Sequence, residues 1–165
     1  MVSCFVWTRR LFGAAIMAVV ASAGLADAHD QEVILTVSGL SEERTFNIRQ
    51  LEEIGTEVVE TTTIWTDGVQ TFVGVPLNLL LDHLEVTSGE LVARAINDYA
   101  ISFPVEEALE PGPIIAFLRN GEQMTVRDKG PLWIIYPYDS SEEFQSEVIY
   151  ARSIWQLNRI EIRAE

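Results

Sequence analysis

The close spacing of short apolar runs constrains the fold of this chain more than any other sequence feature. From residue 32 onward, short runs rich in valine, isoleucine, threonine and aromatic residues follow one another, separated by turn-forming pairs such as Asn97-Asp98 and Asn120-Gly121. A parallel crossover connection needs about a dozen residues or more, so this spacing leaves little room for repeated crossovers. The pattern predicts an α+β fold, a single mixed, mainly antiparallel β domain with short helices.

The expected elements follow from the same runs. Strands are expected at 32–39, 45–48, 57–65, 69–73, 91–96, 99–103, 114–119, 122–126, 132–136, 147–154 and 157–163. Short helices are expected at 50–54, 77–84 and 104–109. Thr66-Asp67-Gly68 is expected to break the strand before Val69, and Asn120-Gly121 is the strongest hairpin signal.

Residues 1–28 have the pattern of an export signal that is cleaved. Arg9 and Arg10 precede the apolar run 11–25, and Ala26-Asp27-Ala28 has the small-x-small pattern of a cleavage site. The run is shorter than the ~20 residues that span a bilayer, so a cleaved signal is expected rather than an anchor. The folded domain is therefore expected at 29–165, located in the periplasm and not inserted in the membrane.

The only cysteine, Cys4, lies inside this predicted signal. Residues 29–165 therefore contain no disulfide, no thiolate nucleophile and no cysteine ligand for a metal.

Charge limits the partners of the predicted domain. Because the signal contains two arginines and one aspartate, residues 29–165 carry 9 basic and 24 acidic residues, a net charge of −15. Binding to nucleic acid or to an anionic membrane surface needs clustered lysine and arginine, so both are excluded as expected partners. Solubility is sufficient to explain the acid excess.

The segment 127–139, RDKGPLWIIYPYD, is the first candidate for a functional site. A charged turn with Arg127 and Lys129 leads into a strand that is apolar enough to be buried, and Tyr136 and Tyr138 follow that strand. A core strand requires neither the cations nor the tyrosines.

Several motifs along the chain together resemble a known family. In order they are VSGL, WTDG, FVGVPLNLLL, AINDYAISFP, NGE, RDKGPLWIIYPYD and SIWQLNRIEI. This series resembles the sulfite-oxidase-type molybdopterin-binding domain over residues 32–163, and is most similar to its small, exported, single-domain, pterin-binding members. The resemblance implies a sulfite-oxidase-like fold and a pterin pocket. It also implies a role like that of periplasmic pterin sensors, which act on the outer domain of a membrane-bound cyclic-di-GMP enzyme.

The chain departs from the catalytic members of that family at one decisive position. Those members bind molybdenum through a cysteine near the segment that reads TTTIWTDG here, at residues 61–68. Serine and threonine are poor substitutes for a soft sulfur ligand, so molybdenum is not expected. The sequence favours a pterin-binding sensor over the alternative, a molybdopterin-dependent oxidoreductase or a subunit of one. A scaffold with a vestigial pocket remains a third hypothesis.

A pterin needs an aromatic face for stacking, and donors and acceptors in the plane of its rings. The candidate pocket residues are Trp65, Thr66, Asn97, Asp98, Tyr99, Arg127, Lys129, Tyr136, Tyr138, Ser153 and Trp155. Trp65 is either a stacking face or a core residue. Trp155 has the same alternatives, and its apolar neighbours Ile154 and Leu157 favour packing. Trp133 is expected in the core.

The polar candidates also have two interpretations each. The segment Asn97-Asp98-Tyr99 is either a turn that makes its own hydrogen bonds or an amide and a carboxylate that bind the guanidine-like edge of a pterin. Arg127 and Lys129 either bind its 4-oxo group, or a phosphate, or form a solvated turn. One of the two tyrosines beside Pro137 is expected to face the pocket and the other the core.

Two groups of residues have the chemistry of metal ligands. His29, if it became the N-terminus, would supply an amine and an imidazole to copper with His83 as a further ligand, but this requires a fold that the sequence does not resemble. His83 is therefore expected at the surface. The acidic segment 139–143 lacks the ligand spacing of a calcium site and is expected to be a solvated loop, open to a partner.

Overall fold

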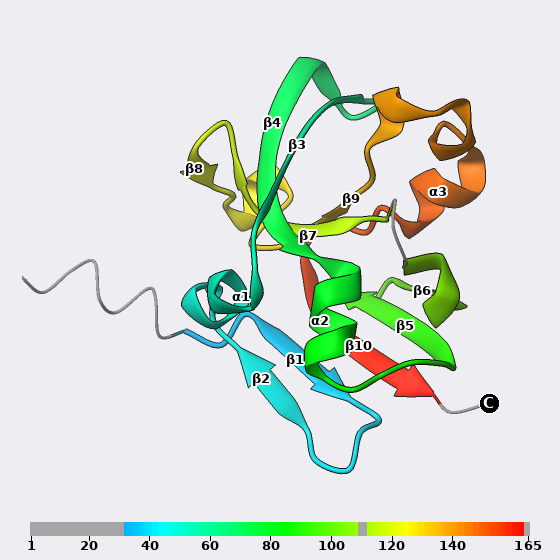
Figure 1. Ribbon diagram of the computed structural model, residues 1–165. Helices are drawn as coiled ribbons and strands as arrows, with labels where there is room; N and C mark the ends of the chain where they lie inside the picture. The colour runs from blue at the N-terminus through cyan, green and yellow to red at the C-terminus, as the bar shows by residue number, and fades with distance from the viewer. Residues whose placement is uncertain (1–31, 109–111, 164–165) are drawn as a thin grey trace, which may run out of the picture.

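The computed structural model describes residues 32–108 and 112–163 (Figure 1). The predicted signal 1–28 and His29 lie outside the described residues. No helix in the described ranges is long and apolar enough to cross a membrane.

Two sheets make up most of the domain. The first has the strand order β2 (Arg44–Phe46), β1 (Leu35–Ser38), β10 (Leu157–Arg163), β5 (Glu90–Ala95) and β6 (Ala100–Pro104). The second has the order β3 (Glu57–Thr63), β4 (Thr66–Pro76), β7 (Ile114–Arg119) and β8 (Glu122–Gln123), with β9 (Trp133–Ile135) paired to β7. Only β1 and β10 pair in parallel among the described strands, so the prediction of a mainly antiparallel α+β domain is confirmed.

The helices are short, as predicted. They are α1 (Ile48–Ile54), α2 (Leu77–His83) and α3 (Glu147–Arg152), with 3-10 turns at Val105–Ala108, Val126–Asp128, Tyr138–Ser140 and Glu142–Phe144. A capping box fixes the start of α1, because Asn47 Oδ1 accepts the Gln50 N–H at 2.8 Å and Gln50 Oε1 accepts the Asn47 N–H at 2.9 Å.

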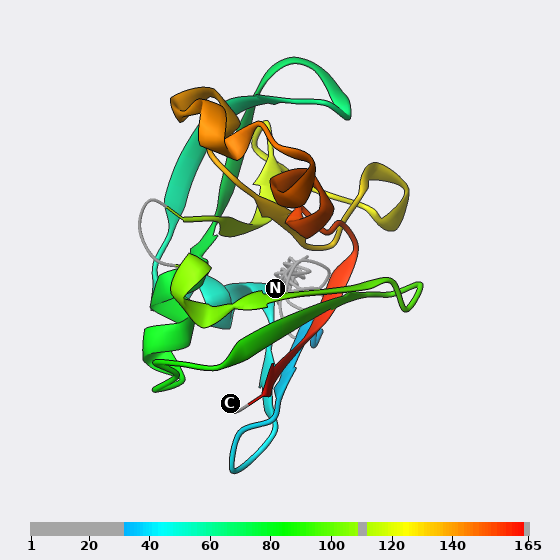
Figure 2. The same ribbon diagram turned by 90° about the vertical axis from the view of Figure 1, so that its right-hand side faces the viewer.

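The core lies where the two sheets and the first two helices meet. Figure 2 shows the first sheet in the lower half of the molecule and the second sheet with α3 in the upper half. Leu35, Leu91, Phe72, Ile115 and Trp133 are fully buried. Burying such a side chain contributes roughly 1.5–3 kcal/mol, which suits a domain whose described residues hold no disulfide.

A glycine in the FVGVP motif allows β4 and β7 to approach closely. A Cβ atom at Gly74 would collide with the backbone of Ile115 and Ala116 on the neighbouring strand. The register of β4 against β7 also shifts between Val73 and Gly74. Glycine is therefore required at this position for steric reasons.

The strand predicted at 147–154 is wrong, because Glu147–Arg152 is the helix α3. Ser146 caps it by accepting the Ile149 N–H with its Oγ, and the partly buried Ile149 and Tyr150 pack on the core from one face. The β-branched content of the segment suggested a strand, but capping and packing determine a helix here.

Two other boundaries also differ from the prediction. The reversal between β3 and β4 occurs at Ile64-Trp65, and Thr66-Asp67-Gly68 already belongs to β4. The strand predicted at 122–126 covers only Glu122–Gln123, because Val126 starts a 3-10 turn.

Candidate functional site

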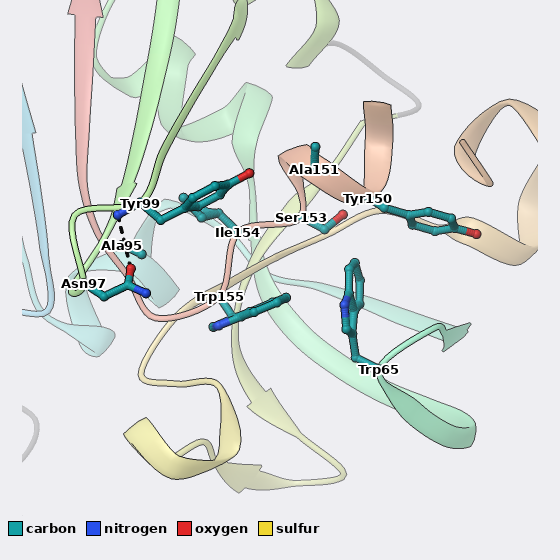
Figure 3. Close-up of a pocket in the computed structure, with 9 residues that line it drawn as sticks. All are labelled: Trp65, Ala95, Asn97, Tyr99, Tyr150, Ala151, Ser153, Ile154 and Trp155. Atoms are coloured by element: carbon teal, nitrogen blue, oxygen red, sulfur yellow. Dashed lines mark hydrogen bonds between the residues drawn. The ribbon is translucent and has the colours of Figure 1, made fainter. Parts of the chain in front are cut away.

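Segments from both sheets enclose a cavity of about 340 Å³ (Figure 3). Its walls come from the β3–β4 turn, the end of β5 with the turn that follows, α3, and the connection from α3 to β10. The lining residues are Trp65, Ala95, Asn97, Tyr99, Tyr150, Ala151, Ser153, Ile154 and Trp155. Five of the predicted pocket residues thus meet at one cavity, namely Trp65, Asn97, Tyr99, Ser153 and Trp155.

Trp65 occupies the centre of an aromatic cluster. Its ring centroid lies 5.7 Å from that of Trp133, 5.8 Å from Tyr150 and 5.6 Å from Trp155, and all three contacts are edge-to-face. Such contacts fix the orientation of an indole. Trp65 therefore packs against the core and also lines the cavity.

Trp155 is a wall residue rather than a core residue. Its neighbours Ile154 and Leu157 are buried, but Trp155 itself is 36% exposed and lines the cavity. A backbone bridge pairs it with the buried Trp133, and the Lys129 ammonium lies 4.4 Å from its ring centroid. The bridge and the cation–π contact hold the indole in place, so the packing role favoured by its neighbours is wrong.

The Asn97-Asp98-Tyr99 segment is the turn between β5 and β6. The Asp98 N–H donates to the Ala95 carbonyl at 3.0 Å, and the Tyr99 N–H donates to Asn97 Oδ1 at 3.2 Å. Asp98 has a φ of 65° and lines a separate polar hollow with Arg94 and Arg159. The turn therefore makes its own hydrogen bonds and presents Asn97 and Tyr99, but not Asp98, to the cavity.

The two tyrosines beside Pro137 lie behind the cavity wall. Tyr138 is buried and its hydroxyl donates to Ser153 Oγ at 2.6 Å, while Ser153 Oγ donates to the Ile149 carbonyl at 2.7 Å. Tyr136 is also buried, and its hydroxyl has no partner among the described residues. Burial raises the pKa of both phenols above the ordinary value. The expectation that one of them faces the pocket is wrong.

The remaining predicted residues do not line the cavity. Arg127 is exposed on the turn Val126–Asp128, and Thr66 Oγ1 is hydrogen-bonded to Thr63 Oγ1 at 2.8 Å. Lys129 is not among the lining residues, but its ammonium lies over the rings of Trp155 and Trp133, at 4.4 Å and 5.6 Å from their centroids. His83 is exposed, as expected, and packs edge-on against Phe46.

Asp139 holds the hairpin that carries Trp65, a role that the sequence did not reveal. One carboxylate oxygen accepts the Thr62 N–H and the other accepts the Thr62 hydroxyl, each at 2.6 Å, while the Asp139 N–H donates to Thr61 Oγ1 at 3.2 Å. The hydrogen bonds from Thr62 hold the pKa of Asp139 below its usual value. The start of the predicted solvated loop is therefore a structural attachment point. Within 32–108 and 112–163, no three histidine, cysteine, aspartate or glutamate residues gather as a metal site.

The cavity suits a flat heterocycle in part. It offers aromatic walls and a few hydrogen-bonding groups, and its volume lies in the range of small-molecule sites. None of its described lining residues is charged, so the carboxylate expected to bind the guanidine-like edge of a pterin is missing from the wall. Trp65 and Trp155, the two predicted stacking residues, line the cavity, whereas Asp98, the predicted carboxylate, does not.

No family model and no curated protein matches the sequence. Among solved structures, the chain is similar to the sulfane dehydrogenase SoxCD from Paracoccus pantotrophus, with a TM-score of 0.58 and 18% sequence identity. The match covers 82% of this chain and 39% of the SoxCD chain. At this identity the likeness shows the fold alone, and it agrees with the mixed, mainly antiparallel architecture.

Proposed function

We propose that this protein is a periplasmic pterin-binding protein that senses its ligand for a membrane signalling partner. One observation supports the binding role most strongly. Two tryptophans and two tyrosines, at positions 65, 155, 99 and 150, line a single uncharged cavity of about 340 Å³. Aromatic walls of this kind bind flat heterocycles by stacking, and the motif resemblance to sulfite-oxidase-type domains indicates a pterin among them.

Titration tests the binding role directly. Indole fluorescence is recorded while 6,7-dimethylpterin, in oxidised and tetrahydro forms, is added to the protein. Stacking against Trp65 or Trp155 should quench the emission in a saturable way. If both forms leave the fluorescence and the heat of mixing unchanged, the pterin-binding proposal fails.

The sensing role requires that the ligand changes a surface that the partner contacts, because a ligand shifts signalling only through differential contact. The β3–β4 turn with Ile64 and Trp65 combines a cavity residue with a side chain that is 61% exposed. The segment 139–144 is attached to this hairpin through Asp139 and Thr62. These two segments are the proposed surface for the periplasmic domain of a membrane protein such as a cyclic-di-GMP enzyme.

Hydrogen exchange tests the sensing surface. Bound pterin should slow amide exchange in residues 61–68 and 139–144, while β2, which lies at the far edge of the first sheet, should exchange unchanged. If the amide exchange rates of both segments are the same with and without bound ligand, the sensing proposal fails.

A molybdopterin-dependent oxidoreductase, or a subunit of one, is the second candidate. It is favoured by the likeness to a solved dehydrogenase structure. The segment 61–68 and the rest of residues 29–165 offer no thiolate for molybdenum, so this candidate requires a different ligand.

A further inference from the structure

Among the side-chain groups that line the cavity and have no hydrogen-bond partner in the described ranges, donors outnumber acceptors. The indole N–H groups of Trp65 and Trp155 can only donate, and neither has a hydrogen-bond partner among the described residues. The hydroxyl of Ser153 is already occupied, because it donates to the Ile149 carbonyl and accepts from Tyr138. Tyr99 and Tyr150 can donate or accept.

Asn97 adds a donor to the wall. Its Oδ1 accepts the Tyr99 N–H at 3.2 Å, and this backbone donor assigns the oxygen to the turn side of the amide. The opposite amide atom, Nδ2, therefore points away from the turn. Figure 3 shows it on the side of Asn97 that faces Trp155. Nδ2 has no hydrogen-bond partner in the described part of the chain.

The carboxylate of Asp98 does not add an acceptor to the cavity wall. Asp98 is the next residue, but its positive φ of 65° places it at the separate hollow with Arg94. Lys129, beside Trp155, adds a further donor near the wall. The lining groups of fixed polarity that have no partner among the described residues, the two indole N–H groups and Asn97 Nδ2, are thus donors, and a ligand must present acceptors to them.

We propose that Asn97 is a specificity-determining residue that selects 4-oxo pterins over 4-amino pteridines. This inference rests on the proposed function. In a 4-oxo pterin the exocyclic oxygen accepts the hydrogen bond from Asn97 Nδ2. In a 2,4-diaminopteridine the amino group at the same place is a donor, so two donors would face each other. The 4-oxo group is thereby assigned to Asn97 instead of to Arg127 or Lys129.

The test compares two ligands of nearly equal size, 6,7-dimethylpterin and 2,4-diamino-6,7-dimethylpteridine. Calorimetry on the wild-type protein should give about fivefold to tenfold tighter binding of the pterin, the effect of one hydrogen bond. Asn97→Asp keeps the acceptor for the Tyr99 N–H and replaces the donor by an acceptor. The preference should therefore shift toward the diamino compound by about tenfold or more.

Two further variants distinguish a specificity role of Asn97 from a purely structural one. Asn97→Ser keeps an acceptor for the turn and replaces the amide N–H₂ by a shorter hydroxyl that can donate or accept, so its affinities for the two ligands should become nearly equal. Asp98→Asn, on the same turn but outside the cavity, should keep the wild-type preference. A purely structural role of Asn97 would weaken both ligands equally and leave their ratio unchanged, which would overturn the inference. Failure of both ligands to bind the wild type would overturn the proposed function itself.

Discussion

At the scale of single residues, Trp133 and Trp155 have opposite surroundings although they are bridged to each other. Trp133 is fully buried and its Nε1 donates to the Ser153 carbonyl at 3.1 Å. Trp155 is 36% exposed and is held by Lys129. The apolar strand around Trp133 correctly predicted a core residue, whereas the apolar neighbours of Trp155 favoured packing although its own side chain lies at the cavity wall.

The first prediction concerns Trp155→Leu. Loss of the indole should weaken 6,7-dimethylpterin binding about tenfold, because an aromatic contact contributes roughly 0.5–1.5 kcal/mol beyond the area it buries. The free energy of unfolding should change little, since the residue is partly exposed. Calorimetry and urea unfolding measure the two effects. Val69→Ala, at an exposed position outside the cavity lining, is the control.

Trp133→Leu should behave in the opposite way. It leaves a cavity in the core and an unpaired carbonyl at Ser153, so the protein should lose about 3 kcal/mol or more of unfolding free energy. A Trp133→Leu variant with wild-type stability would contradict the assignment of this residue to the core.

At the scale of elements, the position of the β3–β4 hairpin depends on Asp139. The sequence separates Asp139 from Thr62 by 77 positions, so no local pattern could pair them. The same limitation applies to α3, where packing of Ile149 and Tyr150 determined the helix. By contrast, strand spacing and turn residues predicted most of the strands, because they act within each short segment.

The hairpin attachment predicts a pH dependence. The pKa of Asp139 is lower in the folded protein than its ordinary value of 3.8, so its hydrogen bonds contribute fully above that pH. This contribution is lost as the pH falls through the folded pKa.

Asp139→Asn should therefore lower the unfolding free energy at pH 7 by about 1 kcal/mol, a modest value because the carboxylate is exposed. The difference between wild type and variant should shrink in urea unfolding at pH 3. Glu142→Gln removes a nearby charge without touching the hairpin and should show neither effect. A difference that stays constant with pH would refute the role of the ionised carboxylate.

At the scale of the whole molecule, the cavity lies where the two sheets and α3 meet, so its walls come from distant parts of the chain (Figures 1 and 3). The sequence predicted five of its residues because motif order identified the segments. It misplaced others, such as Asp98 and Tyr138, because side-chain direction depends on the turn conformation and on the packing of neighbouring segments. The chain spans only 39% of the solved SoxCD chain that it resembles, so the shared fold does not carry over the function of that protein.

The proposed function requires that this fold binds a pterin without molybdenum. The most direct measurement takes protein purified from the periplasm of its native host, denatures it, and determines the released small molecules by mass spectrometry and the metals by elemental analysis. The proposed function predicts a pterin in an amount close to one per chain, with no molybdenum. Molybdenum together with a pyranopterin would contradict it and identify an oxidoreductase.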